Sequence, residues 1–598
     1  MNARWRVLWF AVLLSAAGVA AAANAEKILR VTFQAAETGF DPVRVHDYYS
    51  GSVIEAIYDT LLSYDYLARP AKLVPNSAEA MPQVSADRRT YTFHLRKGIY
   101  FADDPAFKGR KRELTAQDYA YSIRRFFDPK YRSPYAFLFT GKIVGLDELG
   151  DKAKQTGRFD YDSPVAGLQT PDRYTLVIRL KEPDVNFNYV LSFPLTGAVA
   201  REVIDTYGEE SPSHPVGSGA FYLKRYVRSS KIVLAKNPAY RGLVWDSEPG
   251  DNPRFKKIAE RMKGKRLPLL DGVEISIMEE TQSRWLAFQR GETDIEYQLW
   301  EVSPTFMTDD GRLRPEFARR GIQLDRTIDP EITYLAFNMQ DQIGGVPNPV
   351  GGFGKERIAL RRAIAMAYRL DDQIRIIRKA QAVRAQYPIP PGVAGHDPQF
   401  RSSIPYDPRA ANALLERYGY KKGADGYRHQ PDGQPLVIRY TSTPTERDRQ
   451  FDELMKRSLD SIGVRMDIEK ARFPEYLKLQ KQCRVMMSIA AWIADYPDGD
   501  NFMQLLYGPN TGESNNSCYR SKEYDRRYEK SRTLPDGPER DRLYHEMTRL
   551  MEVDTVWLLG DSRIRNALQQ PNVIGFTKHP VLHAEWLYLD LDPDLTAQ

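Results

Sequence analysis

The sequence predicts an α/β protein, because segments with strand-like and helix-like periodicity alternate along most of its length. Residues 28–33 (ILRVTF) alternate as a half-buried strand does, whereas residues 449–462 repeat apolar side chains at helical spacing. The chain has 598 residues, 42% of them hydrophobic and 27% charged, which is an ordinary globular balance. This length is enough for about three or four domains.

The first half of the chain supplies most of the predicted strands. After the strand at 28–33, a helix is predicted over residues 52–62, where Val53, Ile57 and Leu61 share one face. Another helix is predicted over residues 116–127, and further strands at 91–95, 174–180, 232–235, 273–278 and 295–298. Residues 254–266 carry seven basic side chains. They are interpreted as an inserted, solvated helix or loop, with the steering of an acidic partner as the alternative.

The second half begins with a Gly/Pro-rich stretch, residues 343–354, which predicts a mobile surface loop. A long amphipathic helix is predicted over residues 355–380, and four of its arginines are assigned to the solvated face: Arg361, Arg362, Arg369 and Arg375. Gly463 ends the helix at 449–462, and residues 464–468 alternate as a strand. The apolar run at 486–494 predicts a buried strand.

The N-terminus has the pattern of a secretory signal peptide over residues 1–25. Arg4 and Arg6 form a basic region, an apolar stretch follows over residues 7–23, and Ala23-Asn24-Ala25 fits the small-x-small cleavage rule. A membrane anchor is the alternative, but the segment is short and has no stop-transfer pattern. No Cys near the cleavage site offers a lipid acceptor. We therefore expect a soluble periplasmic protein of a Gram-negative cell that is not lipid-anchored.

Cys483 and Cys518 are the only cysteines in the sequence. In an oxidising compartment two cysteines more often form a disulfide than remain thiols. The bond would close a loop whose ends are 35 positions apart. On the chain-entropy model such a bond stabilises the fold by roughly 3–4 kcal/mol.

Composition and motifs argue against several classes of function. A formal net charge of +6 is small against 85 basic and 79 acidic residues, and no motif for reading nucleic acid is present. The eight His form no nucleophile–base pattern, so no catalytic residue is assigned. Pro580 breaks any helix that would align His579 with His583, and Asp495, Asp498 and Asp500 lack the ligand spacing of a calcium loop. No metal site and no cofactor are predicted.

The segment at residues 486–507 (MMSIAAWIADYPDGDNFMQLLY) is the most informative of the chain. The apolar strand ends in Asp495, and Tyr496-Pro497-Asp498-Gly499 forms a predicted turn. A carboxylate at the end of a buried strand is expensive to desolvate unless a cation meets it. Taken alone, the segment favours an internal Lys or Arg as that cation, and the amine of a ligand is the alternative.

Nine further segments carry motifs like the Asp495 segment: YTFHLRKGIY (91–100), LTAQDYAYSIRRFFDP (114–129), PVGSGAFYLKRY (215–226), LAKNPAYRG (234–242), FQRGETDI (288–295), YLAFNM (334–339), LRRAIAMAYRLDDQI (360–374), YDPRAANALLERYGY (406–420) and LDSIGV (459–464). Together with the Asp495 segment, and in this order, they resemble the motifs of family 5 extracellular solute-binding proteins, the peptide, nickel and haem receptors of ABC importers. The resemblance covers nearly the whole mature chain, and its specificity lies in the order of the motifs.

The resemblance implies a two-lobed α/β fold with an extra inserted domain and a ligand cleft between the lobes. Lobe I would comprise residues 26–47, 185–330 and 558–598. The small inserted domain would occupy residues 48–184, and lobe II residues 331–557. The disulfide and Asp495 would both belong to lobe II.

The resemblance also implies which residues bind ligand. In peptide-binding members, the aspartate matching Asp495 receives the ligand's α-ammonium. Segments aligned with ligand-contacting segments supply the remaining candidates: Ala491, Trp492, Ile493, Tyr496, Tyr297, Trp300, His46, Asp47, Tyr48 and Tyr49. For each of these, packing in the core is the alternative. Ile489 and Gln480 stand where some oligopeptide receptors have basic residues, which leaves open how a ligand carboxylate is held.

Three functions follow as hypotheses. The first is a monomeric periplasmic receptor that captures short peptides and delivers them to an inner-membrane ABC permease. The second is a receptor for another small ligand, such as an amine-bearing compound, haem or a nickel chelate. The third, an exported hydrolase or chaperone-like protein, is disfavoured because no nucleophile–base pair is present.

Overall fold

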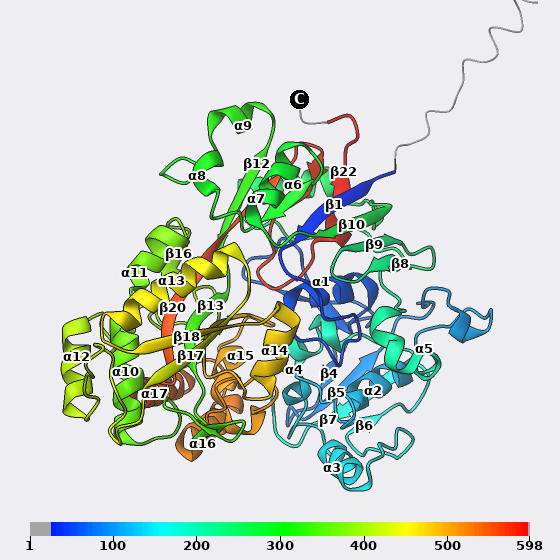
Figure 1. Cartoon of the computed structure of the whole chain (residues 1–598). Coiled ribbons are helices and arrows are strands. Elements are labelled where there is room, and N and C mark those ends of the chain that lie inside the picture. The colour runs from blue at the N-terminus through cyan, green and yellow to red at the C-terminus, as the bar shows by residue number, and fades with distance from the viewer. Residues whose placement is uncertain (1–25, 596–598) are drawn as a thin grey trace, which may run out of the picture.

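The computed structural model describes residues 26–595, which form two lobes around one shared twelve-stranded sheet (Figure 1). The first lobe contains the parallel pairs that β1 makes with β10 and β11. Its strands are β1 (Ile28–Phe33), β8 (Phe221–Val227), β9 (Lys231–Lys236), β10 (Gly272–Ile277), β11 (Ile295–Tyr297), β12 (Gln323–Ile328) and the C-terminal part of β20 (Trp557–Gln569). Helices α6 (Pro253–Met262) and α7 (Thr281–Gln289) accompany them.

The second lobe contains the remaining strands of this sheet and most of the long helices. Its strands are the N-terminal part of β20, β13 (Glu331–Phe337), β16 (Ala382–Arg384), β17 (Val437–Ser442), β18 (Arg465–Lys470) and β19 (Met487–Ile493). Its main helices are α10 (Lys355–Ala367), α12 (Pro408–Arg417), α13 (Glu446–Asp460), α14 (Phe473–Lys481), α16 (Lys522–Arg532) and α17 (Pro538–Asp554).

The chain passes between the lobes at two adjacent places. β12 is followed almost directly by β13, and β20 pairs with β13 through its first half and with β12 and β11 through its second half. Two buried ion pairs join these crossing segments, Asp329–Arg565 at 2.8 Å and Glu331–Arg563 at 2.9 Å. The two crossing segments are therefore part of the shared sheet.

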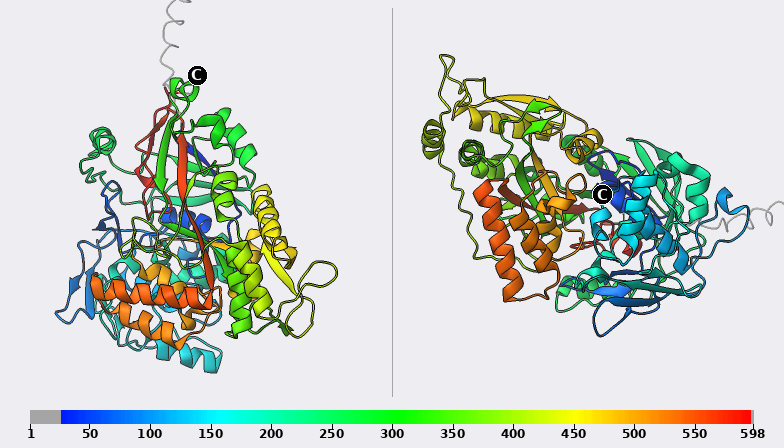
Figure 2. Two further views of the ribbon diagram at one scale, coloured as in Figure 1. Left: turned by 90° about the vertical axis from the view of Figure 1, so that its left-hand side faces the viewer. Right: turned by 90° about the horizontal axis from the view of Figure 1, so that it is seen from below.

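A separate small domain lies beside the first lobe and across from the second (Figure 2). Its four-stranded sheet has the order β4-β5-β7-β6, and helices α2 (Ala116–Arg125) and α3 (Leu146–Thr156) belong to it. The strands are β4 (Gln83–Val84), β5 (Thr90–His94), β6 (Leu168–Gln169) and β7 (Thr175–Arg179). Helix α1 (Tyr48–Ile57) precedes this domain in the chain. The predicted α/β fold with two lobes and an inserted domain is confirmed.

The predicted strands are present, with ends that differ by at most two residues. The helix predicted at 52–62 is α1, which begins at Tyr48 because the Asp47 side chain accepts a hydrogen bond from the Ser50 amide and caps the helix. The helix predicted at 355–380 is wrong in its second half. Helix α10 ends at Ala367, and a short helix and a π-helical turn follow over residues 370–377.

The assignment of Arg361 to the solvated face is wrong. Arg361 is fully buried, and its guanidinium donates to the backbone carbonyls of Val350, Gly352, Asp554 and Thr555 at 2.6–3.2 Å. Five N–H donors in a planar fork can satisfy several carbonyls at once. Arg361 therefore ties α10 to the end of α17, a role that helical periodicity cannot reveal.

The basic segment at 254–266 forms α6 and the loop after it. Its charges are largely balanced within the chain, because five of them lie 3.0–3.6 Å from an aspartate: Arg254–Asp325, Lys256–Asp251, Arg261–Asp592, Lys263–Asp246 and Lys265–Asp590. This arrangement agrees with a solvated helix. The predicted signal peptide lies outside the described residues, and no helix within residues 26–595 is long and apolar enough to cross a bilayer.

Candidate functional site

A cavity of about 280 Å³ lies between the two lobes and the inserted domain. On the second-lobe side, its wall is formed at the carboxyl ends of the parallel strands β17 and β19, which are in register at Tyr440 and Met487. On the first-lobe side, Gln34 and Ala35 follow the carboxyl end of β1. Ligands of α/β proteins bind at such strand ends, so the position fits a binding site.

Asp495 is buried in this wall and has no cationic partner. It directly follows Ala494 at the end of β19, and its side chain is absent from the ion pairs of residues 26–595. Asn501 Nδ2 donates to Oδ2 at 2.8 Å, and the Tyr135 hydroxyl of the inserted domain donates to Oδ1 at 3.3 Å. Burial raises the pKa of Asp495 to about 7, more than these two hydrogen bonds lower it.

The nearby Asp498 shows the contrasting arrangement. Its carboxylate accepts from both Nη atoms of Arg540 at 2.6 and 2.8 Å, so its charge is compensated inside the second lobe. Asp498 is also absent from the cavity wall, whereas Asp495 belongs to it. The expectation that an internal cation pairs with Asp495 is therefore wrong among the described residues.

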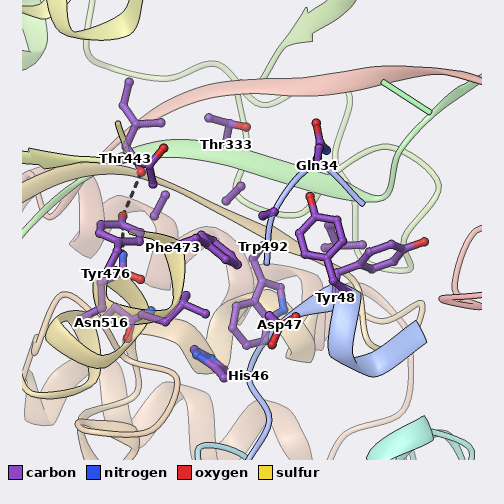
Figure 3. Close-up of a pocket in the computed structure, with 18 of the residues that line it drawn as sticks. Gln34, His46, Asp47, Tyr48, Thr333, Thr443, Phe473, Tyr476, Trp492 and Asn516 are labelled. Atoms are coloured by element: carbon purple, nitrogen blue, oxygen red, sulfur yellow. Dashed lines mark hydrogen bonds between the residues drawn. The ribbon is translucent and has the colours of Figure 1, made fainter. Parts of the chain in front are cut away.

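Aromatic rings surround the position of Asp495. The rings of His46, Tyr135 and Trp492 have centroids 5.7–6.3 Å apart, and all three line the cavity. Neither ring nitrogen of His46 has a hydrogen-bond partner among the described residues, and burial lowers its pKa to about 3. Figure 3 shows His46, Trp492 and Phe473 together in this part of the cavity. The wall combines apolar faces with two buried carboxylates that form no ion pair within residues 26–595: Asp495 and Asp47, the second of which caps α1.

Strand β19 presents a free edge to the cavity. Its residues 487–493 pair with β13 on one side, whereas on the other side β17 is in register only at Met487. Ala490, Ala491 and Ile493 line the cavity, and Ala491 is exposed. Backbone groups on an unpaired strand edge can hydrogen-bond to an extended peptide.

The other residues predicted from the sequence fall into two groups. His46, Asp47, Tyr48 and Tyr49 line the cavity, although the Asp47 carboxylate already accepts hydrogen bonds from Thr38 and Ser50. Tyr496, Tyr297 and Trp300 do not line it. Tyr496 donates to Asp500 within the second lobe, Trp300 packs against Arg378, and Tyr297 lines an adjoining smaller pocket.

The disulfide between Cys483 and Cys518 is confirmed, with a Cα–Cα distance of 6.2 Å that is normal for such a bond. Cys483 lies shortly before β19, and Cys518 ends the segment that carries Asp495, Asn501 and the cavity residue Asn516. The bond therefore fixes both ends of the segment that forms this wall. No group of three or more His, Cys, Asp or Glu side chains within residues 26–595 is arranged to hold a metal ion.

Comparison with known proteins identifies the family. The model of bacterial extracellular solute-binding proteins, family 5, matches residues 72–514. The chain belongs to this family. These residues include the inserted domain, the Asp495 segment and Cys483, whereas β1, α1, Cys518 and β20 lie outside the matched range.

Individual relatives of this solute-binding protein cover nearly its whole length. Di/tripeptide-binding protein 2 of Pseudomonas aeruginosa is 28% identical over 98% of this chain and 99% of its own. Heme-binding protein A of Haemophilus influenzae is 24% identical over 91% and 89%. Among solved structures, the periplasmic binding protein DppA from Helicobacter pylori in complex with peptide STSA superposes with a TM-score of 0.74, at 23% identity, over 94% and 98%. This structure has the same fold.

Sequence reasoning missed several side chains of the solute-binding protein's cavity. They include the guanidinium groups of Arg378, Arg447 and Arg563, the aromatic rings of Tyr135, Phe473 and Tyr476, and the imidazole of His583. Arg447 lies in the first turn of α13, and Arg563 in the middle of β20. No local motif marks these positions, because the tertiary fold alone brings them to the cavity. Only Arg447 could have been found from the sequence, because it lies shortly after the strand that precedes α13.

Proposed function

We propose that this protein is a receptor for short peptides with a free α-ammonium group, and that Asp495 anchors this group. The observation that carries the proposal is a buried carboxylate without a cationic partner in an interlobe cavity. An ammonium group that is desolvated together with it forms a strong, charge-assisted interaction. Trp492 and Tyr135 add aromatic faces, which attract cations.

The opposite end of the peptide would lie at the N-terminus of α13. Arg447 Nε donates to Asp448 at 3.0 Å, and neither Nη atom of Arg447 has a hydrogen-bond partner among residues 26–595. The positive end of the helix dipole and an unoccupied guanidinium together favour a carboxylate. This arrangement supplies a cation where Ile489 and Gln480 leave none.

Between the two ends, the peptide backbone would pair with the free edge of β19 at Ala491 and Ile493. A cavity of about 280 Å³ is at the lower end of the range for small-molecule sites, which favours two or three residues over longer peptides. Tyr48, Tyr49 and Trp492 would contact its side chains, and Asp47 would hold α1 in place. Tyr496 would support the wall from behind.

We further propose that the protein acts as a monomer in the periplasm, after removal of residues 1–25, and delivers its ligand to an inner-membrane ABC permease. Family membership supports a binding role, and the absence of an assembled nucleophile–base pair in the sequence supports binding without turnover. The lobes would open to admit the ligand and close around it.

Isothermal titration calorimetry with a dipeptide, its N-acetylated form and its C-amidated form tests the proposal. We expect the unmodified dipeptide to bind and each modification to weaken binding by at least about tenfold, because each removes one charged anchor. Unchanged binding after N-acetylation would contradict the role of Asp495. Separate titrations with haem and with a nickel chelate test these two alternative ligands.

A further inference from the structure

A side pocket of about 80 Å³ adjoins the main cavity on the first-lobe side. Six residues line both spaces, which are therefore adjacent: Gln34, Tyr48, Tyr49, Ile493, Arg563 and His583. The remaining wall comes from β1, α7, β11 and β20, at the carboxyl ends of the parallel strands of the first lobe. Figure 3 shows two of these shared residues, Gln34 and Tyr48, on the same side of the main cavity.

The acidic and basic side chains that line the side pocket are all of one sign. Arg284, Arg563 and Arg565 line it, and no Asp or Glu does. The main cavity, in contrast, is lined by three aspartates and three arginines. Each arginine of the side pocket is paired with a carboxylate that lies outside its lining: Glu296 at 3.8 Å, Glu331 at 2.9 Å and Asp329 at 2.8 Å. The carboxylates that compensate these arginines are therefore contributed by residues outside the pocket lining.

Arg563 is the arginine with free donors. Its Nε donates to Glu331 at 2.9 Å, but neither Nη atom has a hydrogen-bond partner among residues 26–595. Arg284 instead donates to the Tyr297 carbonyl and the Thr281 hydroxyl, and Arg565 Nη1 contacts the Tyr48 hydroxyl at 3.4 Å. A guanidinium held by Nε, with both Nη atoms free, is suited to bidentate binding of a carboxylate.

The backbone of the pocket is also unusual. Gln298, which follows β11 and lines the pocket, has a φ of 56°, a conformation that non-glycine residues seldom adopt. Its backbone N–H donates a hydrogen bond to the Asn566 carbonyl at 3.0 Å, and its side chain is hydrogen-bonded to the side chain of Gln34. Strain of this kind concentrates at ligand sites, where the surrounding structure maintains it.

We propose that this side pocket binds a carboxylate side chain of the ligand, so that the preferred peptides carry Asp or Glu at one of their first two positions. The inference rests on the proposed function, because it takes the peptide amine to lie at Asp495. Ile493 lines the side pocket and lies two residues before Asp495, or about 7 Å along the strand. That separation is within reach of the side chain of the first or second peptide residue.

Calorimetry with two matched peptide pairs tests the proposal: Ala-Glu against Ala-Gln, and Glu-Ala against Gln-Ala. In each pair the shape is nearly constant and only the charge changes. We expect the acidic peptide of at least one pair to bind the wild-type protein about 10- to 100-fold more tightly than its amide. Arg563→Gln should abolish this preference, so that the acidic peptide binds no more tightly than its amide.

Arg384→Gln is the matched control, because Arg384 lies on β16, which pairs with β20 beside Arg563, but lines neither space. It should keep the acidic preference. Equal affinity for acid and amide in both wild-type pairs would overturn the inference and leave the proposed function standing. An equal loss of both peptides in Arg563→Gln would also overturn it, since Arg563 would then bind the α-carboxylate or only support Glu331. If none of the four peptides binds, the proposed function itself fails.

Discussion

At the scale of single residues, the environments of Asp495 and Asp498 differ although the two lie three positions apart. Both are buried, but only Asp498 has a guanidinium partner, Arg540. Burying a carboxylate alone costs free energy, and a ligand cation can offset that cost when it enters. The same residue type therefore has a structural role at one position and a proposed ligand-binding role at the other.

We expect Asp495→Asn to weaken an amine-bearing peptide by about two to three orders of magnitude, because a buried ion pair that loses one partner costs roughly 3–5 kcal/mol. The free energy of unfolding without ligand should not fall, since the variant no longer buries a charge. N-acetylation of the peptide should reproduce the loss in wild type and add little in the variant. Calorimetry on the four protein–ligand combinations, with thermal unfolding, measures both effects.

Asp498→Asn is the control for this substitution. It removes the buried partner of Arg540 and leaves only the exposed Asp536, so it should lower the melting temperature of the ligand-free protein. If Asp495→Asn destabilised the ligand-free protein in the same way and bound both peptides as wild type does, the anchor role would be wrong.

At the scale of elements, α10 is held to α17 through one buried side chain. We expect Arg361→Leu to lower the free energy of unfolding by at least about 3 kcal/mol, because it leaves four buried carbonyls without a donor. Arg375→Leu, at a side chain that is 74% exposed, should change it by less than about 0.5 kcal/mol. Urea unfolding measures the free energy of unfolding of both variants. Similar losses in the two would refute the role of Arg361 in joining α10 to α17.

The segment between Cys483 and Cys518 depends on its covalent closure. Replacing both cysteines with alanine should lower the free energy of unfolding by about 4 kcal/mol on the chain-entropy model, since the closed loop spans 35 positions. Chemical unfolding of the double variant against wild type measures the difference. Labelling of two free thiols in the denatured, non-reduced protein from the periplasm would show that the bond does not form there.

Local patterning predicted those elements whose own sequence contains the signal. The strand before Asp495 could be recognised from its continuous apolar run, and α13 from apolar side chains at helical spacing that are buried on one face. Strand β20 could not, because its thirteen residues are nearly all buried and mix charged with apolar side chains. Its arginines satisfy carboxylates brought from distant segments, so no local period describes it. Arg563 was missed for the same reason.

At the scale of the whole molecule, we expect closure of the lobes around the empty cavity to be coupled to protonation of Asp495. The pKa of Asp495 is raised to about 7 in this closed arrangement, whereas a solvated carboxyl group titrates near 3.8. Between these values the closed form binds more protons than an open form with a wet Asp495, so closure without ligand becomes more favourable as the pH falls from 7 towards 4. The full effect is on the order of 4 kcal/mol.

We therefore expect small-angle scattering of the ligand-free protein to show that lowering the pH from 8 to 5 favours a smaller radius of gyration more in the wild-type protein than in Asp495→Asn, because the amide needs no proton to be buried. Other buried groups respond alike in both proteins: Glu513, whose pKa burial raises to about 7, also favours closure at low pH, whereas His46 and His583, whose pKa burial lowers to about 3, oppose it. An identical pH response in wild type and variant would contradict the linkage.

The place where the chain crosses between the lobes bears on the order in which a ligand would be recognised. If the lobes rotate about the two crossing segments, Arg563 would move little, because it lies on one of these segments and pairs with Glu331 on the other. Asp495, which follows β19 in the second lobe, would be farther from this axis and would move when the lobes separate. An acidic group would thus find its partner already in place in the open molecule, and the amine would be captured last. The acidic group of the ligand would therefore govern how fast the ligand associates, and its amine how slowly it dissociates.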